Sequence, residues 1–239
     1  MAWTTTESAG DGFIERPFAF DAPTSGSWIP GVYRAPENGG GADRLVLLGH
    51  GGTTDKHAPY IVEVARQLAQ RGIASMAIDG PGHGERATAG AAPGLEWLAR
   101  VWEDGGGTNG VISDWGEALD FIEAEFGART TGWWGLSMGT MMGLPVSASD
   151  ERIQVALLGL MGVGGPNSDD LERLAPQLAC PVRFLVQWDD EIVPRATALE
   201  LFGLLGSTKK TLHANPGIHV AVPGFEVAAS VEYLDHHLR

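Results

Sequence analysis

Short apolar runs alternate along the chain with longer segments in which apolar residues recur every three or four positions. Residues 45–48 are wholly apolar and bounded by turn residues, which indicates a strand buried on both faces. Residues 60–70 carry one apolar stripe at helical spacing, and Gly72 follows as a stop signal. The same criteria predict strands over 13–20, 27–34, 45–48, 73–78, 131–135, 155–160, 182–187 and 211–213. They predict helices over 60–70, 113–126, 140–147, 168–178, 195–205 and 225–238.

Strands that alternate with helices of this length predict the α/β class, with a parallel sheet covered by helices on both faces. The 239 residues suit one domain. Two stretches break the alternation: residues 86–110, an insertion that carries Trp97 and Trp102, and residues 161–167, a glycine-rich connection. Both follow predicted strands, where the loops of an open α/β sheet build the site. We therefore expect them to select the substrate.

Composition narrows the classes of partner. Sixteen basic residues against thirty acidic ones give a net charge of −14, which disfavours nucleic acid and anionic membranes as partners. The single Cys180 excludes an internal disulfide framework and a thiolate zinc site. Residues 1–12 are polar and do not resemble a signal peptide, and no run of 18 apolar residues occurs. These features favour a cytoplasmic location.

The strongest local motif is Gly135-Leu136-Ser137-Met138-Gly139, between a predicted strand and a predicted helix. A sharp turn at that point lifts a serine hydroxyl clear of the sheet, and the two glycines let the turn close. Upstream, His50-Gly51-Gly52 directly follows another predicted strand. Backbone amides aimed at a developing oxyanion stabilise acyl transfer, so the amides of Met138 and Gly52 are the expected donors. A glycine turn without that role is the alternative for this loop, and His50 is interpreted as a structural hydrogen-bonding residue.

A serine nucleophile needs a base, and the base needs an orienting group. Asp189-Asp190-Glu191 follows the strand at 182–187, and His219 lies in a Pro-Gly turn after the last short strand. Taken singly, each acid could cap a helix, and the histidine could be a surface residue. Together, Ser137, an aspartate and His219 follow the order serine, acid, histidine, each at the carboxyl end of a predicted strand.

These segments resemble the α/β-hydrolase superfamily from about Phe13 onward, and among its members the small serine carboxylesterases related to the dienelactone-hydrolase and prolyl-oligopeptidase-like groups. The matching segments are His50-Gly51-Gly52, Asp79-Gly-Pro-Gly-His-Gly84, the elbow at Ser137, Cys180-Pro181 with Asp190-Glu-Ile-Val-Pro194, and Pro216-Gly217-x-His219. The resemblance implies an eight-stranded, mostly parallel sheet with an antiparallel second strand. It also places the acid four residues before Pro194, which favours Asp190 over Asp189.

The chain departs from that pattern at identifiable positions. Dienelactone hydrolases use a cysteine nucleophile, whereas the elbow here holds serine, and Cys180 is interpreted as core packing. Gln187 and Trp188 stand where the family often has glycine, which leaves the choice between the two aspartates open. No helical cap is predicted after the strand at 155–160. His83 is interpreted as structural, and His236-His237 as helix surface with no metal site.

The sequence therefore predicts a serine hydrolase that cleaves carboxylic esters of short to medium acyl chain, without cofactor or metal. Ser137 attacks, His219 accepts the proton and Asp190 orients the imidazole. Trp97 and Trp102 either wall an apolar acyl site or pack the insertion onto the sheet. Thioesters, amides or acyl transfer are alternatives for the same triad, and a non-catalytic binding protein is the rival from another class. The expected partner is a small ester, and a homodimer stays open.

Overall fold

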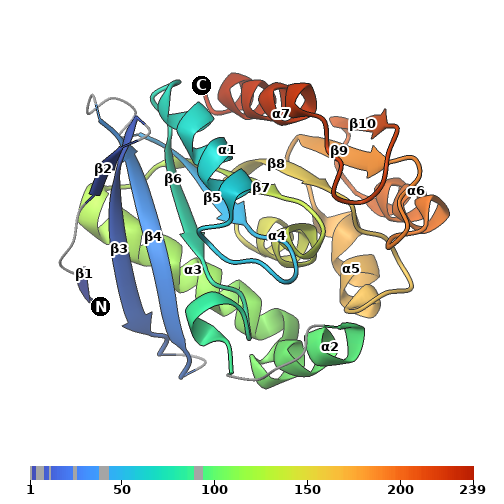
Figure 1. Cartoon of the computed structure of the whole chain (residues 1–239), viewed down its shortest axis with the longest axis horizontal. Coiled ribbons are helices and arrows are strands. Elements are labelled where there is room, and N and C mark those ends of the chain that lie inside the picture. Colours follow the sequence, from blue (N-terminus) through green and yellow to red (C-terminus); the bar gives the residue numbers. More distant parts are fainter. Residues whose placement is uncertain (1, 4–7, 11, 24–25, 38–42, 89–93) are drawn as a thin grey trace.

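The computed structural model describes residues 2–3, 8–10, 12–23, 26–37, 43–88 and 94–239. In this part of the chain one mixed sheet runs through the molecule in the order β1-β3-β4-β6-β5-β7-β8-β9-β10, and β2 pairs with β3 (Figure 1). The strands are β1 (Ala2–Trp3), β2 (Ser8–Gly10), β3 (Phe13–Asp21), β4 (Trp28–Pro36), β5 (Arg44–Gly49), β6 (Ala74–Ile78), β7 (Thr130–Gly135), β8 (Ile153–Gly159), β9 (Val182–Gln187) and β10 (Lys210–Asn215).

Eight strands, β3 to β10, form the body of the sheet, and the two short strands β1 and β2 extend it at the β3 edge. β4 is antiparallel to both β3 and β6, whereas β6, β5, β7, β8, β9 and β10 pair in parallel. This arrangement confirms the expected eight-stranded, mostly parallel sheet with an antiparallel second strand.

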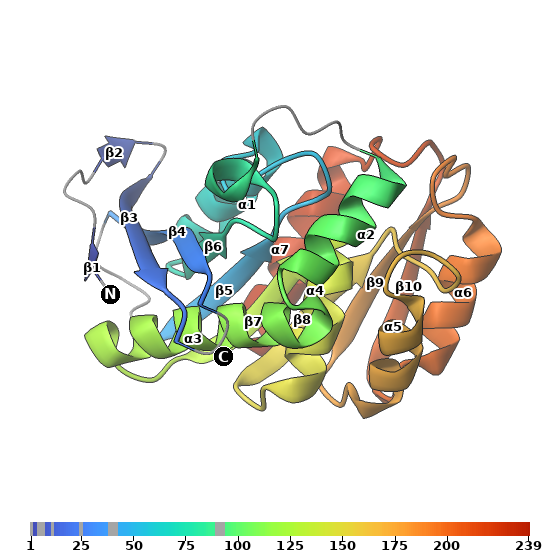
Figure 2. The ribbon, with the colours of Figure 1, turned by 90° about the horizontal axis from the view of Figure 1, so that it is seen from below.

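Helices cover both faces of the sheet. They are α1 (Pro59–Ala69), α2 (Leu95–Asp104), α3 (Gly107–Phe126), α4 (Met138–Ser149), α5 (Ser168–Leu174), α6 (Arg195–Leu204) and α7 (Gly224–His237), with short 3-10 turns at Gly84–Arg86 and Ala175–Gln177. Apolar residues of α1 and α7 share one core cluster, and those of α2 to α6 share the other. Figure 1 shows α1 with α7 above the sheet and α2 with α3 below it, and Figure 2 views the molecule from the α3 side.

Strand periodicity explains how one sheet serves two cores. Successive side chains of a strand point to opposite faces. On the central strand β7, Trp133 accordingly packs into the cluster of α2 to α6, and Trp134 into the cluster of α1 and α7. Both indoles are buried, and Trp134 donates a hydrogen bond from Nε1 to Ser230 Oγ (2.8 Å). Large side chains from a single strand thereby anchor helices on both faces.

The insertion at 86–110 is more ordered than the sequence suggested. It contains α2, and α3 begins at Gly107 instead of residue 113. Residues 89–93 of the insertion lie outside the described residues. Glycines lie between the two helices, and a glycine-rich sequence is typical of a loop, so the short apolar stripes on either side did not predict helices. Pro145 lies inside α4, which continues through it to Ser149.

The parallel strands all deliver their carboxyl ends to one edge of the sheet. β7 ends two residues before Ser137, β9 ends three residues before Asp190, and β10 ends four residues before His219. This edge is therefore where the sequence-predicted catalytic residues meet. No helix among the described residues is long and apolar enough to cross a membrane.

Candidate active site

The turn between β7 and α4 holds Ser137 in a backbone conformation that side chains rarely adopt, with φ +58° and ψ −122°. A non-glycine residue at positive φ is strained, and such strain persists only where the surroundings hold it. Here the amide of Ser137 donates to the carbonyl oxygen of Gly159 at the end of β8 (2.9 Å). The amide of Gly159 in turn donates to Thr140 Oγ1 on the first turn of α4 (2.7 Å). Gly159 at the end of β8 thus holds the elbow through two hydrogen bonds, one to Ser137 and one to Thr140.

Steric contacts explain the two glycines of the motif. A Cβ at Gly135 would lie 2.6 Å from the carbonyl oxygen of Gly139, and a Cβ at Gly139 would lie 2.3 Å from the carbonyl oxygen of Gly49. Real Cβ atoms do not approach backbone oxygens so closely. The motif is therefore required by the close approach of α4 to the ends of β5 and β7.

Ser137, His219 and Asp190 form one continuous hydrogen-bonded chain. His219 Nε2 lies 2.9 Å from Ser137 Oγ, and His219 Nδ1 lies 2.7 Å from Asp190 Oδ2. Because a carboxylate only accepts, Nδ1 carries the proton and Nε2 is free to accept one from the serine. The side chains of His219 and Asp190 are 8% and 3% exposed, so water competes little for their hydrogen bond.

The structure separates the two neighbouring aspartates. Asp190 accepts from the amides of Ile192 (2.9 Å) and Val193 (2.8 Å) with its other oxygen, which aims the carboxylate at His219. Asp189 is exposed and accepts from the amide of Gly217 (3.2 Å). Asp190 is therefore the carboxylate that meets the imidazole, and Asp189 holds the backbone of the histidine's loop.

Gln187, one of the departures from the family pattern, has a structural task. Its side chain is buried, and Nε2 donates to the carbonyl oxygens of Ile218 (3.1 Å) and Ala221 (2.9 Å) on either side of His219. The next residue, Trp188, donates its amide to Asn215 (2.7 Å), and its ring lies under the guanidinium of Arg195 at 4.0 Å. The side chain of Gln187 thus supports the histidine loop, which we define as residues 216–223.

The two expected oxyanion donors border the same cavity as Ser137. Met138 is the first residue of α4, so its amide has no partner within the helix and points out at the helix N-terminus. Gly52 lies in the loop after β5, whose shape Tyr60 supports: the Tyr60 hydroxyl accepts from the amide of Gly51 (2.6 Å) and lies 3.0 Å from Thr54 Oγ1. No motif in the sequence marks Tyr60, because only the fold brings α1 back to that loop.

His50 connects the loop after β5 to the loop after β6 by hydrogen bonds. Its Nδ1 donates to the carbonyl oxygen of Gly51 (2.8 Å), and its Nε2 accepts from the amide of Gly80 (2.9 Å). Complete burial lowers the pKa of His50 to about 4, so the ring is neutral at physiological pH. These contacts agree with a structural role for His50.

The segment around Asp79 is held by a buried charge cluster. Asp79 accepts from Lys56 Nζ (2.6 Å) and from the amides of Lys56 (3.0 Å) and Glu85 (2.9 Å). A Cβ at Gly84 would lie 2.3 Å from the Asp79 carboxylate, which explains that glycine. His83 is buried beside this cluster, with Nδ1 2.8 Å from the carbonyl oxygen of Pro81, and burial lowers its pKa. This contact, too, agrees with a structural role.

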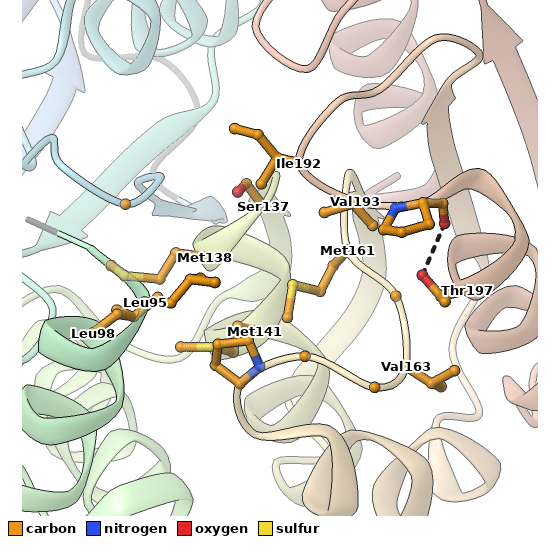
Figure 3. A pocket seen from close by; sticks show the side chains of 16 residues that line it. Leu95, Leu98, Ser137, Met138, Met141, Met161, Val163, Ile192, Val193 and Thr197 are labelled. Atoms are coloured by element: carbon orange, nitrogen blue, oxygen red, sulfur yellow. Dashed lines mark hydrogen bonds between the residues drawn. The ribbon is translucent and has the colours of Figure 1, made fainter.

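A cavity of about 320 Å³ opens beside Ser137 (Figure 3). Its described lining carries no charged side chain and consists mainly of apolar residues from α2, α4, the loop after β8 and the loop before α6. The apolar side chains are Leu95, Leu98, Met138, Met141, Met161, Val163, Pro166, Ile192, Val193 and Pro194.

Trp97 and Trp102 are not among the described residues that line this cavity, so of the two alternatives for them the structure favours packing. Trp102 is 4% exposed and packs in the core, and Trp97 meets the ring of His83 edge-on at 4.8 Å. The insertion contributes Leu95 and Leu98 instead, one helical turn apart on α2. The 161–167 connection lines the cavity as expected, through Met161 to Pro166. Among the described residues no group of three or more His, Cys, Asp or Glu could hold a metal ion.

Comparison with known proteins places this geometry in a family. Residues 40–162 match the family model described as serine aminopeptidase, S33. A cold-adapted esterase from an Arctic intertidal metagenomic library, solved with bound PEG, is 58% identical over the whole of both chains, with a TM-score of 0.93. No curated protein matches the chain.

More distant structures share the fold. An acetyl xylan esterase from Paenibacillus sp. R4 is 17% identical, with a TM-score of 0.75 over 99% of this chain and 89% of its own. A dienelactone hydrolase from Anabaena variabilis is 20% identical, with a TM-score of 0.68 over 94% of this chain and 99% of its own. The matched segment spans β5 to the loop after β8 and includes the elbow at Ser137. Together with the whole-length similarity to the Arctic protein, it shows that the chain belongs to the α/β-hydrolase family.

Proposed function

We propose that the protein is a serine esterase that hydrolyses neutral carboxylic esters of short to medium acyl chain. One observation carries the proposal: the hydrogen-bonded chain from Asp190 through His219 to Ser137 ends at an apolar cavity. The 58% identical Arctic protein is described as an esterase, which supports ester hydrolysis for this chain as well.

The geometry supports an acyl-enzyme mechanism. Ser137 Oγ transfers its proton to His219 Nε2 as it attacks the ester carbonyl carbon, and Asp190 stabilises the resulting imidazolium. The amides of Met138 and Gly52 stabilise the oxyanion. The imidazolium then protonates the departing alcohol oxygen, which leaves the acyl group on Ser137. A water molecule, deprotonated by His219, releases the acid in the second half of the cycle.

The cavity restricts the substrate class. Its volume of about 320 Å³ lies at the small end of ligand pockets, which favours short and medium acyl groups over long ones. The described lining offers no cation for a substrate carboxylate and no carboxylate for a free α-amine. An aminopeptidase needs such an anionic anchor, so the site supports a neutral ester better than the peptide substrate that the family description names.

Initial rates on p-nitrophenyl esters from acetate to palmitate test the proposal, with Ser137→Ala as the control. We expect turnover to peak at a short or medium chain and to fall at least about 10⁴-fold in the variant. Turnover that survives in Ser137→Ala would overturn the serine mechanism. A matching set of p-nitroanilides and acyl thioesters would identify an amidase or a thioesterase, and added alcohols would reveal acyl transfer.

A further inference from the structure

Three consecutive carboxylates of the acid loop, residues 188–194, all contact the histidine loop. Asp190 Oδ2 lies 2.7 Å from His219 Nδ1, and Asp189 Oδ2 accepts from the amide of Gly217 (3.2 Å). Glu191 Oε2 accepts from the backbone amide of His219 itself (2.9 Å). His219 is thus held twice by neighbouring acids, at its ring by Asp190 and at its main chain by Glu191.

The contact of Glu191 with the backbone of His219 restricts a motion that the contact of Asp190 with the ring does not. Asp190 holds the imidazole at Nδ1, but the position of the ring also depends on where the backbone of His219 lies. A hydrogen bond from a backbone amide to a carboxylate is among the stronger ones, and it is directional. Glu191 therefore restricts the Cα position from which the imidazole reaches Ser137 Oγ.

The histidine loop has few other anchors at this point. Residues 218–223 belong to no helix or strand, and Gly217 has a φ of +117° that favours glycine. The residues on either side of the histidine are exposed, Ile218 at 49% and Val220 at 77%, so apolar packing does not hold them. Hydrogen bonds that Glu191 accepts and that Gln187 donates hold the backbone of this segment instead.

We propose that Glu191 is a positioning residue for the esterase reaction: its carboxylate holds the backbone of His219 so that Nε2 stays in line with Ser137 Oγ. The proposal rests on the proposed function, in which His219 is the general base. Glu191 touches neither the substrate nor the reacting atoms and acts through His219.

The test compares Glu191→Ala, which removes the acceptor, with Glu191→Gln, which keeps an oxygen in its place. Misplacement of a catalytic group by about 1 Å can cost up to about a hundredfold in rate, so we expect kcat of Glu191→Ala on p-nitrophenyl butyrate to fall about ten- to a hundredfold. KM should stay within about twofold, because the side chain does not line the acyl cavity. Glu191→Gln should recover most of kcat. Glu200→Ala, an exposed glutamate of α6, is the matched control and should keep the wild-type rate.

A second readout does not depend on turnover. The Nδ1 proton that His219 shares with Asp190 gives a far-downfield proton NMR signal, which should broaden or vanish in Glu191→Ala and return in Glu191→Gln. Wild-type kcat and an unchanged signal in Glu191→Ala would overturn the positioning role. An inactive wild-type protein would instead refute the esterase function, and the NMR signal alone would then decide whether Glu191 positions His219.

Discussion

At the scale of single residues, the active site depends on close backbone approaches that only glycine permits. A Cβ added to Gly139 would lie only 2.3 Å from the carbonyl oxygen of Gly49. Backbone cannot rotate away as a flexible side chain can, so any added atom must push α4 away from β5. The same displacement would move Ser137, which stands at the N-terminus of α4.

Gly139→Ala should therefore damage both stability and catalysis. Overpacking of this kind costs about 1–3 kcal/mol of the free energy of unfolding, and a shifted nucleophile should lower kcat at least about tenfold. Urea denaturation followed by circular dichroism, together with p-nitrophenyl butyrate kinetics, measures both effects. Wild-type values for both would show that α4 can move without cost.

A second glycine provides the matched comparison. Gly116 lies within α3, and a Cβ there would meet nothing within 4 Å. Glycine inside a helix is less favourable than alanine by about 0.5–1 kcal/mol. Gly116→Ala should therefore raise the free energy of unfolding by that amount and leave kcat unchanged. A destabilised Gly116→Ala would contradict the contacts found around α3.

Residues marked by a local motif could be predicted from the sequence, whereas residues that act through distant contacts could not. Ser137, Asp190 and His219 could be found because each lies shortly after a predicted strand and because their order is informative. Gln187 and Glu191 lie 34 and 28 residues from the backbone groups that they hold. No local pattern encodes such contacts, since the partner loops are brought together only by the parallel pairing of β9 with β10.

At the scale of elements, α2 is the helix that the sequence pattern did not predict, and two of its residues line the cavity beside Ser137. Its apolar residues do follow helical spacing, but glycines surround a stretch of only ten residues. The two large aromatic residues of this segment, Trp97 and Trp102, pack against the protein and do not line the cavity. Leu95 and Leu98 reach the cavity because residues three apart share a helix face.

Leu95 offers a clean test of that assignment, because it lines the cavity while remaining 68% exposed. Leu95→Ser should lower kcat/KM for p-nitrophenyl hexanoate about three- to tenfold, since part of the apolar contact with the acyl chain is lost. The acetate ester, which is too short to gain the full contact, should change less. Glu96→Ser, the next residue along α2, serves as the control. An equal loss of kcat/KM on both esters would show that Leu95 does not contact the acyl chain.

At the scale of the whole molecule, buried histidines link stability to pH. The pKa of His50 is about 4 in the folded protein, below its ordinary value of 6.5, and burial is the main cause. Above pH 6.5 neither state is protonated, so the contribution to stability is fully present. As the pH falls from 6.5 to 4, only the unfolded chain takes up the proton, and the free energy of unfolding decreases by about 1.4 kcal/mol per pH unit. Burial lowers the pKa of His83 as well, which adds loss in the same direction.

His50→Gln should consequently flatten this part of the profile. Glutamine does not titrate, and its amide can still accept from the amide of Gly80. Urea unfolding at a series of pH values between 7 and 4 measures the difference between the two proteins. Carboxylates whose pKa is lowered, such as Asp150 and Asp235, affect both proteins equally and cancel. Parallel profiles would show that His50 protonates alike in both states.

The net charge of −14 acts on the substrate before it reaches the site. An acidic molecule repels anions over roughly a Debye length, about 10 Å at 0.1 M salt, and the described lining of the cavity offers no cation to offset that repulsion. The p-nitrophenyl ester of succinate, which carries a free carboxylate, should therefore show a lower kcat/KM than the butyrate ester of the same chain length. Added sodium chloride should narrow the gap, because screening weakens the repulsion while the neutral ester is little affected. A gap that stays constant from 10 mM to 0.5 M salt would place the discrimination in desolvation of the carboxylate at the apolar wall instead of in the field of the whole protein.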